Sequence, residues 1–258
     1  MLASDLEPPP VTDAALQPAR VPQSTYQMNW PAALKALRKL LNDKSDTVQV
    51  FEIMRALNGG ETAKSYHKLL ETVQGGRMAY ERVELADRLI DRSFISGFEP
   101  GTLGAAYRDF LDRTGYSADG LAEISKVGAK PIAAAHPYAW FGRRVRDQHD
   151  LWHILTGYSA DEGLGEACLV AFSYAQTKGL GWALIGLGAA LRGGLFTPHA
   201  RAIWEGYRHG RQAAWLLGED WETNLAEPLD ALRKRLRTLP AKRYEAIPAE
   251  ERDAVLKL

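Results

Sequence analysis

The sequence predicts an all-α protein, built as a single helical domain of about nine helices. Apolar residues recur at helical spacing along most of the chain. No segment alternates apolar and polar residues as a half-buried strand does, and no hairpin turn separates two such segments. The length of 258 residues, with 46% apolar and 25% charged residues, is ample for a buried core.

The first part of the chain is expected to contain four helices. Asn29 can cap the first helix and Pro31 suits its first turn, while the run Asn58-Gly-Gly ends the second. The pair Gly75-Gly76 is interpreted as a break between the third helix and the fourth. The expected ranges are 29–41, 46–57, 61–74 and 80–90.

The remaining helices follow the same rules. A turn at 98–104 leads into a helix at 103–114, and residues 116–120 precede another helix. Gly157 ends a helix at 139–156, because glycine adopts the left-handed conformation of a C-terminal cap at little cost. Further helices are expected at 164–176, 181–191, 198–217 and 220–236.

The stretch 179–191 contains no charged residue and four glycines. It is too short for a membrane span, which needs about 20 residues. Two interpretations stay open: a buried core helix, or a helix that lines an apolar ligand tunnel or groove or lies against a membrane. Glycines would allow a lipid chain or another helix to approach closely.

Residues 1–25 differ from the rest, because they contain five prolines and little periodic pattern. We expect a mobile, Pro-rich N-terminal arm here, followed by the all-helical domain at 26–258. The arm is acidic at its start and lacks the features of a secretory signal or a mitochondrial presequence. A bacterial cytoplasmic protein is the simplest interpretation.

The overall charge excludes one class of partner. Lys plus Arg number 32 and Asp plus Glu number 32, so the formal net charge is zero. A nucleic-acid binder that relies on a global positive field is therefore not expected. Cys168 is the one cysteine, so no internal disulfide can form and a reducing compartment is favoured. We interpret it as a buried core residue.

The polar cluster at 149–153 carries the most information about function. His149, Asp150 and His153 fall at roughly 0°, 100° and 40° around one helix, so their side chains share a face. Glu166 arrives near the start of the next helix. Two imidazoles with one or two carboxylates suit zinc or iron(II), whereas the nitrogen ligands make magnesium less favoured. A hydrogen-bonded knot between two helices is the alternative.

These residues also carry a family resemblance. The run His149-Asp-Leu-Trp-His153, followed by Leu-Thr-Gly157 and then Leu-Gly-Glu166, resembles the signature of the Coq-four family of ubiquinone (coenzyme Q) biosynthesis proteins. Residues 99–107 and 220–229 also fit, and the similarity covers about 80–236. The gap to Glu166 is twelve residues where the family usually has eleven. Glu166 keeps the family context, and Glu162 is a possible substitute.

The resemblance implies a function, a cofactor and partners. It implies that His149, Asp150, His153 and Glu166 hold a divalent metal ion, and that the protein binds a polyprenylated quinone precursor or another isoprenoid lipid. The expected reaction is the oxidative removal of the ring C1 carboxylate, with hydroxylation at that carbon. The alternative is a non-catalytic scaffold that works with other ubiquinone-biosynthesis proteins. In either case the chain would associate peripherally with the bacterial inner membrane.

Other residues are weaker candidates. Arg143 and Arg146 are three apart and could clamp a substrate carboxylate, although a solvated basic face is the plainer interpretation. Tyr158 could contact the site or serve in packing. A late basic face, Arg201, Arg208 and Arg211, could meet an interface or anionic headgroups, or simply be surface. A homodimer is expected, and hydrolysis of a prenyl phosphate is a minor alternative activity.

Overall fold

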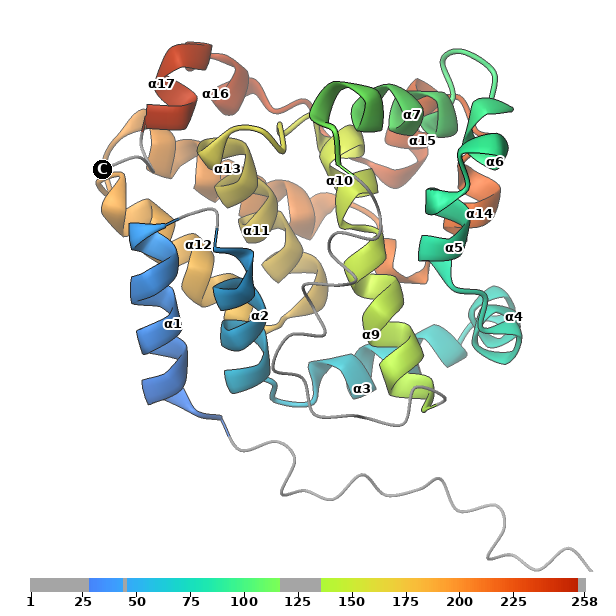
Figure 1. Cartoon of the computed structure of the whole chain (residues 1–258), viewed down its shortest axis with the longest axis horizontal. Coiled ribbons are helices and arrows are strands. Elements are labelled where there is room, and N and C mark those ends of the chain that lie inside the picture. Colours follow the sequence, from blue (N-terminus) through green and yellow to red (C-terminus); the bar gives the residue numbers. More distant parts are fainter. Residues whose placement is uncertain (1–27, 44–45, 117–135, 255–258) are drawn as a thin grey trace, which may run out of the picture.

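The computed structural model describes residues 28–43, 46–116 and 136–254, and their regular secondary structure is helical, which confirms the all-α prediction (Figure 1). The first half contains α1 (Trp30–Asn42), α2 (Thr47–Ala56), α3 (Glu61–Leu70), α4 (Val73–Glu81), α5 (Leu85–Ile90), α6 (Arg92–Ser96) and α7 (Leu103–Thr114). The second half contains α9 (Pro137–Asp147), α10 (His149–Thr156), α11 (Gly163–Thr177), α12 (Leu180–Arg192), α13 (Pro198–Gln212), the 3₁₀ turn η3 (Leu216–Gly218), α14 (Trp221–Asn224), α15 (Leu229–Leu236), α16 (Lys242–Glu245) and α17 (Ala249–Ala254).

The interpretation of Gly75-Gly76 as a break is wrong, because both residues lie inside α4. Thr72 caps this helix by accepting a hydrogen bond from the Gly75 amide at 3.0 Å. A Cβ atom at Gly75 would collide with the Leu69 carbonyl oxygen. This glycine therefore permits a close backbone approach at the start of a helix rather than ending one.

The described part of the chain has more and shorter helices than the sequence predicted. The helix predicted at 139–156 is two, α9 and α10, which meet at Gln148. The segment at 198–217 divides into α13 and η3, and the segment at 220–236 divides into α14 and α15. Apolar periodicity continues through such short turns, so the sequence pattern did not mark the divisions.

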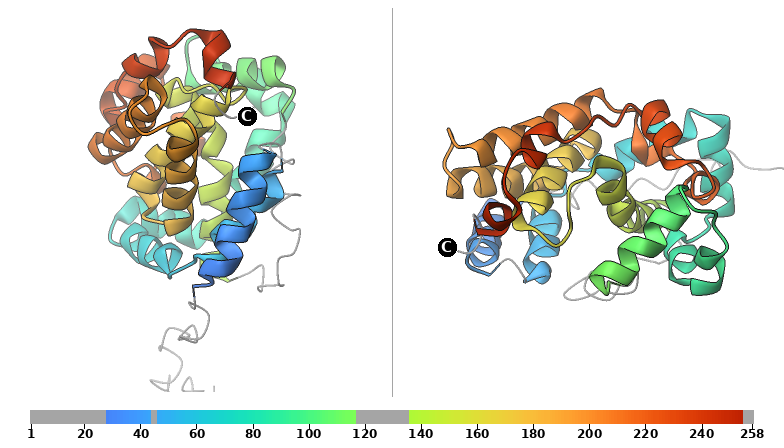
Figure 2. Two further views of the ribbon diagram at one scale, coloured as in Figure 1. Left: turned by 90° about the vertical axis from the view of Figure 1, so that its left-hand side faces the viewer. Right: turned by 90° about the horizontal axis from the view of Figure 1, so that it is seen from above.

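Helix α11 forms the centre of the fold, with α13 packed on one side and α12 on another (Figures 1 and 2). Nearly all of its residues are buried, among them Cys168, as expected. A Cβ atom at Gly206 of α13 would collide with the Cys168 carbonyl oxygen, so glycine allows the two helices to touch. The large core around α11 includes Trp140, Trp152 and Trp221.

Helix α12 is buried on one side, as a core helix would be, and exposed on the other, and its role in a ligand tunnel or at a membrane stays a prediction. Ile185 and Ala189 are buried against the rest of the molecule, whereas Leu187 and Leu191 are 54% and 55% exposed. Within the described ranges, no helix combines the length and the apolar character that a membrane crossing requires. The N-terminal arm at 1–25 and the helix expected after 116–120 lie outside the described residues.

Candidate metal centre

The site is built where the chain turns back between α10 and α11. Helix α10 ends at Gly157, whose φ of 79° lies in the left-handed region that glycine adopts readily. A second glycine, Gly165 in the first turn of α11, lies against the loop before it, because a Cβ atom there would collide with the Ser159 carbonyl oxygen. This close approach places the next residue, Glu166, opposite α10.

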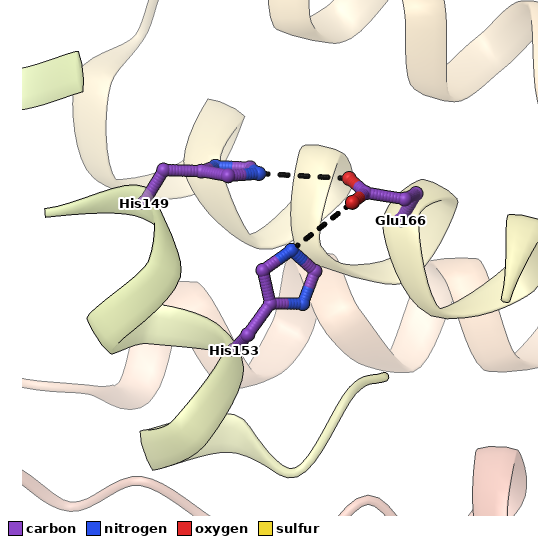
Figure 3. Close-up of side chains that lie close together, drawn as sticks. All are labelled: His149, His153 and Glu166. Carbon is purple, nitrogen blue, oxygen red and sulfur yellow. Dashed lines mark ion pairs between the residues drawn. The ribbon is translucent and has the colours of Figure 1, made fainter. Parts of the chain in front are cut away.

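Three of the predicted site residues meet across this turn (Figure 3). The His149 Nε2 atom lies 3.5 Å from Glu166 Oε2, and the His153 Nε2 atom lies 3.2 Å from Glu166 Oε1. One donor atom from each of the three residues lies within 4.8 Å of the other two. The helical spacing of the histidines and the return of α11 are thus both needed to assemble the cluster.

The imidazole of His153 is held in one orientation. Its Nδ1 atom lies 2.8 Å from the Tyr158 carbonyl oxygen, which can only accept, so Nδ1 carries the proton and donates it. The ring stacks on Phe110 with 6.4 Å between centroids and is almost fully buried. The other nitrogen, Nε2, is buried without a hydrogen-bond partner among the described residues. In neutral His153, its lone pair therefore faces the Glu166 carboxylate.

His149 is supported from a different helix. Its ring lies parallel to the indole of Trp182 on α12, with 6.1 Å between centroids and 14° between planes. The two histidine rings are perpendicular to each other at 4.8 Å. The side chain of Glu166 is 41% exposed, so the cluster is reached by solvent from the Glu166 side.

The Glu166 carboxylate and the His153 imidazole shift each other's pKa values. Partial removal from water raises the pKa of the Glu166 carboxyl, but the two imidazoles outweigh this effect and hold the pKa well below its usual range. Burial lowers the pKa of His153, whereas the negative charge of the Glu166 carboxylate beside its ring raises it, and the net shift is upward. A positive charge between these groups is favourable, whether a proton or a metal ion supplies it.

The residues fit a divalent metal ion. Two donors on a tetrahedral zinc at about 2.1 Å lie roughly 3.4 Å apart, close to the separations of 3.2 and 3.5 Å seen here. A metal-bound histidine commonly donates its second ring N–H to a backbone carbonyl, as His153 does to Tyr158. Two imidazoles and one carboxylate also form the donor set of iron(II) sites with open positions.

The structure separates the two glutamates that the longer gap left open. Glu162 accepts a short hydrogen bond from the Tyr244 hydroxyl and lies 3.6 Å from the Arg252 guanidinium, so its partners come from the C-terminal part of the chain. Glu166 faces the histidines. Asp150 is buried nearby but is not in the set of donors within 4.8 Å, and its role as a ligand stays a prediction.

The three candidate substrate-binding residues already have partners. Arg143 forms two hydrogen bonds with the Glu84 carboxylate, at 3.0 and 2.6 Å. Arg146 donates to Asp147 at 2.6 Å. Tyr158 is buried, and its hydroxyl lies 3.4 Å from His209 Nδ1. Their role in substrate binding stays a prediction, although Tyr158 does orient His153 through its carbonyl.

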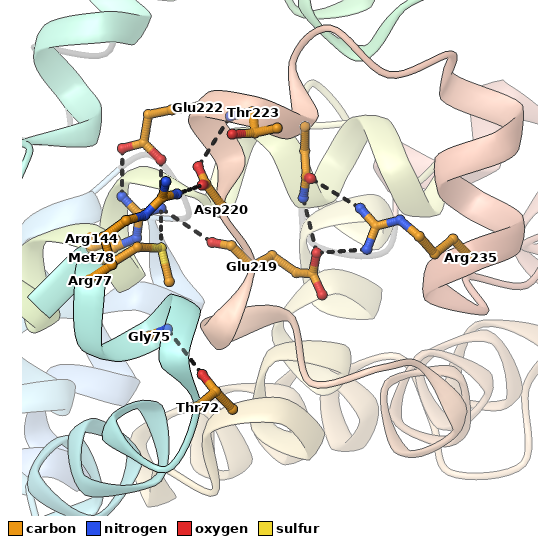
Figure 4. A network of polar contacts seen from close by, with 11 residues as sticks. Thr72, Gly75, Arg77, Met78, Arg144, Glu219, Asp220, Glu222, Thr223 and Arg235 are labelled. Atoms are coloured by element: carbon orange, nitrogen blue, oxygen red, sulfur yellow. Dashed lines mark hydrogen bonds and ion pairs between the residues drawn. The ribbon is translucent and has the colours of Figure 1, made fainter.

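A second polar cluster lies behind the joint between α9 and α10 (Figure 4). The buried Arg144 guanidinium forms two 2.7 Å hydrogen bonds with the Glu222 carboxylate of α14. The neighbouring Trp221 donates from its indole nitrogen to the side chain of Gln148 at 2.9 Å. These contacts fix the joint immediately before His149.

A cavity of about 430 Å³ borders the cluster between α7 and α10. Phe110 and Arg113 of α7 line it together with His153 and Ser159. Sequence reasoning did not identify Phe110 or Trp182 as neighbours of the histidines. Each lies on a helix remote in sequence, so no local pattern could have indicated them.

Comparisons with known proteins agree with the sequence resemblance. The family described as "Coenzyme Q (ubiquinone) biosynthesis protein Coq4" matches residues 18–242. "Ubiquinone biosynthesis protein COQ4 homolog, mitochondrial" of Danio rerio is 30% identical over 234 residues, covering 87% of this chain and 81% of that protein. "Ubiquinone biosynthesis protein coq4, mitochondrial" of Pyrenophora tritici-repentis is 28% identical over 207 residues, covering 76% and 68%.

One solved structure shares the fold. It is the crystal structure of a putative ubiquinone biosynthesis protein from Nostoc punctiforme, which matches with a TM-score of 0.57 at 20% sequence identity. The match covers 81% of this chain and 98% of that one.

Proposed function

Because the chain belongs to the Coq4 family of coenzyme Q (ubiquinone) biosynthesis proteins, we propose that it catalyses a metal-dependent oxidative decarboxylation in that pathway. The substrate is a polyprenylated hydroxybenzoate-type precursor, and the ring C1 carboxylate is replaced by a hydroxyl. The bond between the ring and the carboxylate breaks and releases CO₂, water supplies the new hydroxyl, and the two electrons and two protons removed pass to O₂, which is reduced to hydrogen peroxide. The chain is proposed to act beside other proteins of the pathway, as a homodimer.

One observation supports this proposal most strongly: the oriented, buried Nε2 of His153 faces the Glu166 carboxylate and has no hydrogen-bond partner among the described residues. In neutral His153 this contact sets a lone pair against a carboxylate, which is costly in a buried setting unless a cation lies between them. His149, His153 and Glu166 would hold the ion, with Asp150 as a further candidate. The ion would supply open positions for the substrate carboxylate and for O₂, for which iron(II) is better suited than zinc.

The chain's own residues would prepare the site for such a substrate. The Tyr158 carbonyl and Phe110 hold the His153 ring, and Trp182 holds that of His149. The cavity beside His153 has a volume of about 430 Å³, enough for an aromatic ring. Arg113 lines this cavity and pairs with Asp161. A substrate carboxylate could compete with Asp161 for its guanidinium.

The second candidate function is a metal-free scaffold that holds the isoprenoid precursor for other enzymes. The 3.2 Å separation between His153 Nε2 and Glu166 Oε1 supports it, because an ion pair between a protonated imidazole and a carboxylate also has this separation. In that case protonated His153 would pair with Glu166 and join α10 to α11.

Metal content separates the two functions. We expect anaerobically purified wild-type protein to contain close to one equivalent of iron or zinc, and His153→Ala to lose it. His199→Ala is the matched control, because His199 lies on α13 and contacts the Glu251 carbonyl rather than the cluster. Unchanged metal content in His153→Ala would show that the proposed ligand set is wrong.

Turnover tests the reaction itself. Metal-replete protein is expected to release CO₂ from a prenylated 4-hydroxybenzoate only in the presence of O₂. Full metal content and retained lipid binding without CO₂ release would reject the decarboxylase and favour the scaffold. Phosphate release from a prenyl phosphate without O₂ would instead indicate the hydrolase.

A further inference from the structure

The charge of the molecule is distributed unevenly over its helices. The whole chain has equal numbers of acidic and basic residues. Helices α1, α12 and α13 nevertheless contain seven Lys or Arg residues and one acidic residue, Glu205. The Glu205 side chain is mostly buried and accepts a hydrogen bond from the Arg243 amide, so it does not offset the outer charges. Helix α12 contacts both α1 and α13, which unites these charges on one flank (Figure 2).

The same flank exposes large apolar side chains at the turn between α12 and α13. Leu191 and Leu195 are each more than half exposed, and Phe196 is 89% exposed. On the outer face of α13, Trp204 is 61% exposed and lies between Arg201 and Arg208 at helical spacing. Neither arginine forms an ion pair with a carboxylate of the described residues. We call these six residues, Leu191, Leu195, Phe196, Arg201, Trp204 and Arg208, the α12–α13 corner.

We propose that the α12–α13 corner docks on an anionic lipid bilayer. The guanidinium groups would meet lipid phosphates while Phe196 and the leucines enter the boundary of the acyl chains. Trp204 suits the headgroup level, where an aromatic ring with one polar atom is favoured. The proposal goes beyond the reaction proposed above and does not depend on a metal ion.

The positive charge and the exposed apolar side chains of the α12–α13 corner together favour a lipid bilayer over other partners. An isologous dimer through the corner would place the same cationic surface against itself, and the like charges would repel. A nucleic acid would satisfy the arginines but would leave the exposed leucines and Phe196 in water. An anionic bilayer satisfies both kinds of group.

The α12–α13 corner is linked to the candidate metal centre by helix α12. Helix α12 carries Trp182 against His149 near its N-terminus and leads to the corner at its other end. Its 13 residues span about 20 Å. One helix therefore connects the docking surface with the cluster, at a distance that a long prenyl chain can bridge.

Vesicle flotation with the full-length protein tests the proposal. We expect binding to phosphatidylcholine vesicles that contain phosphatidylglycerol, weaker binding at high salt, and little binding to phosphatidylcholine alone. Phe196→Ser should weaken binding about tenfold, since a large apolar group no longer enters the bilayer. Tyr80→Ser is the matched control, because Tyr80 is 90% exposed on α4, at the other end of the molecule (Figure 1).

Charge reversal provides the second arm. Arg201→Glu with Arg208→Glu should reduce binding to anionic vesicles more than tenfold. Lys64→Glu with Lys234→Glu, which makes the same change on α3 and α15, should have a much smaller effect. Equal losses in the test and control variants, or no binding of the wild type, would overturn the proposal. So would a wild-type dimer that Phe196→Ser converts to a monomer, because a second copy would then cover the corner.

Discussion

Two polar clusters lie on either side of the joint between α9 and α10, and they are organised in opposite ways. In the first, the Arg144 guanidinium meets the Glu222 carboxylate through two hydrogen bonds (Figure 4). The Trp221 indole also donates a hydrogen bond to the Gln148 side chain. In the second, the His153 Nε2 lies 3.2 Å from the Glu166 carboxylate, and a neutral His153 would present only a lone pair to it (Figure 3). A cluster whose charges match donor to acceptor can be purely structural. A cluster that brings acceptors together is stabilised by a positive charge, which a proton on His153 or the proposed metal ion would supply.

The largest expected effect follows from removing the carboxylate of the second cluster. Glu166→Gln should weaken metal binding at least about 100-fold, because the amide keeps the shape but loses the negative charge. The unfolding free energy of the metal-free protein should change by less than about 1 kcal/mol. Isothermal titration with zinc, combined with urea unfolding in a chelator, measures both. A large loss of stability without metal would show that Glu166 is structural.

The first cluster should respond in the reverse manner. Among the described residues, Glu222→Ala leaves the buried Arg144 guanidinium the Glu219 carbonyl and the Met78 sulfur as hydrogen-bond acceptors, and should lower the unfolding free energy by about 2–3 kcal/mol. Asp112→Ala is the control, because its pair with Arg92 is largely exposed and should contribute less than about 1 kcal/mol. Chemical unfolding gives both values. Metal content per folded molecule should be unchanged, and loss of the ion in Glu222→Ala would mean that the clusters are coupled.

The sequence revealed the second cluster but not the first. His149 and His153 are brought together by helix periodicity alone, and the Leu-Gly-Glu context identified Glu166 across a gap of unusual length. The contact between Arg144 and Glu222 joins residues 78 positions apart, and no periodic pattern encodes such a pair. For the same reason the sequence predicted helices but not their ends: Gly75 and Gly76 looked like a break, although α4 continues through them.

A smaller effect should come from the backbone that positions Glu166. Gly165→Ala would push the first turn of α11 away from the Ser159 carbonyl, and should destabilise the protein by about 1–3 kcal/mol while weakening metal binding. Gly142 lies within α9 and a Cβ atom there would meet Thr62 only at 3.9 Å. Gly142→Ala should therefore raise stability by about 0.5–1 kcal/mol. Thermal and urea unfolding would show the opposite signs. If both variants changed stability in the same direction, the close approach of Gly165 to the Ser159 carbonyl would not be needed to form the site.

The smallest expected effect comes from two tryptophan variants. They test whether metal binding and membrane docking depend on different side chains. Trp182→Leu removes the ring that stacks on His149 and should weaken metal binding about three- to tenfold, as expected for one aromatic contact. Trp204→Leu changes the same residue type on the exposed face of α13 and should leave metal binding intact. Zinc titration and vesicle flotation on both variants form a crossed experiment, because Trp204→Leu should weaken vesicle binding and Trp182→Leu should not. If both variants lose both properties, α12 transmits change between the metal centre and the flank, and the two regions act as one unit.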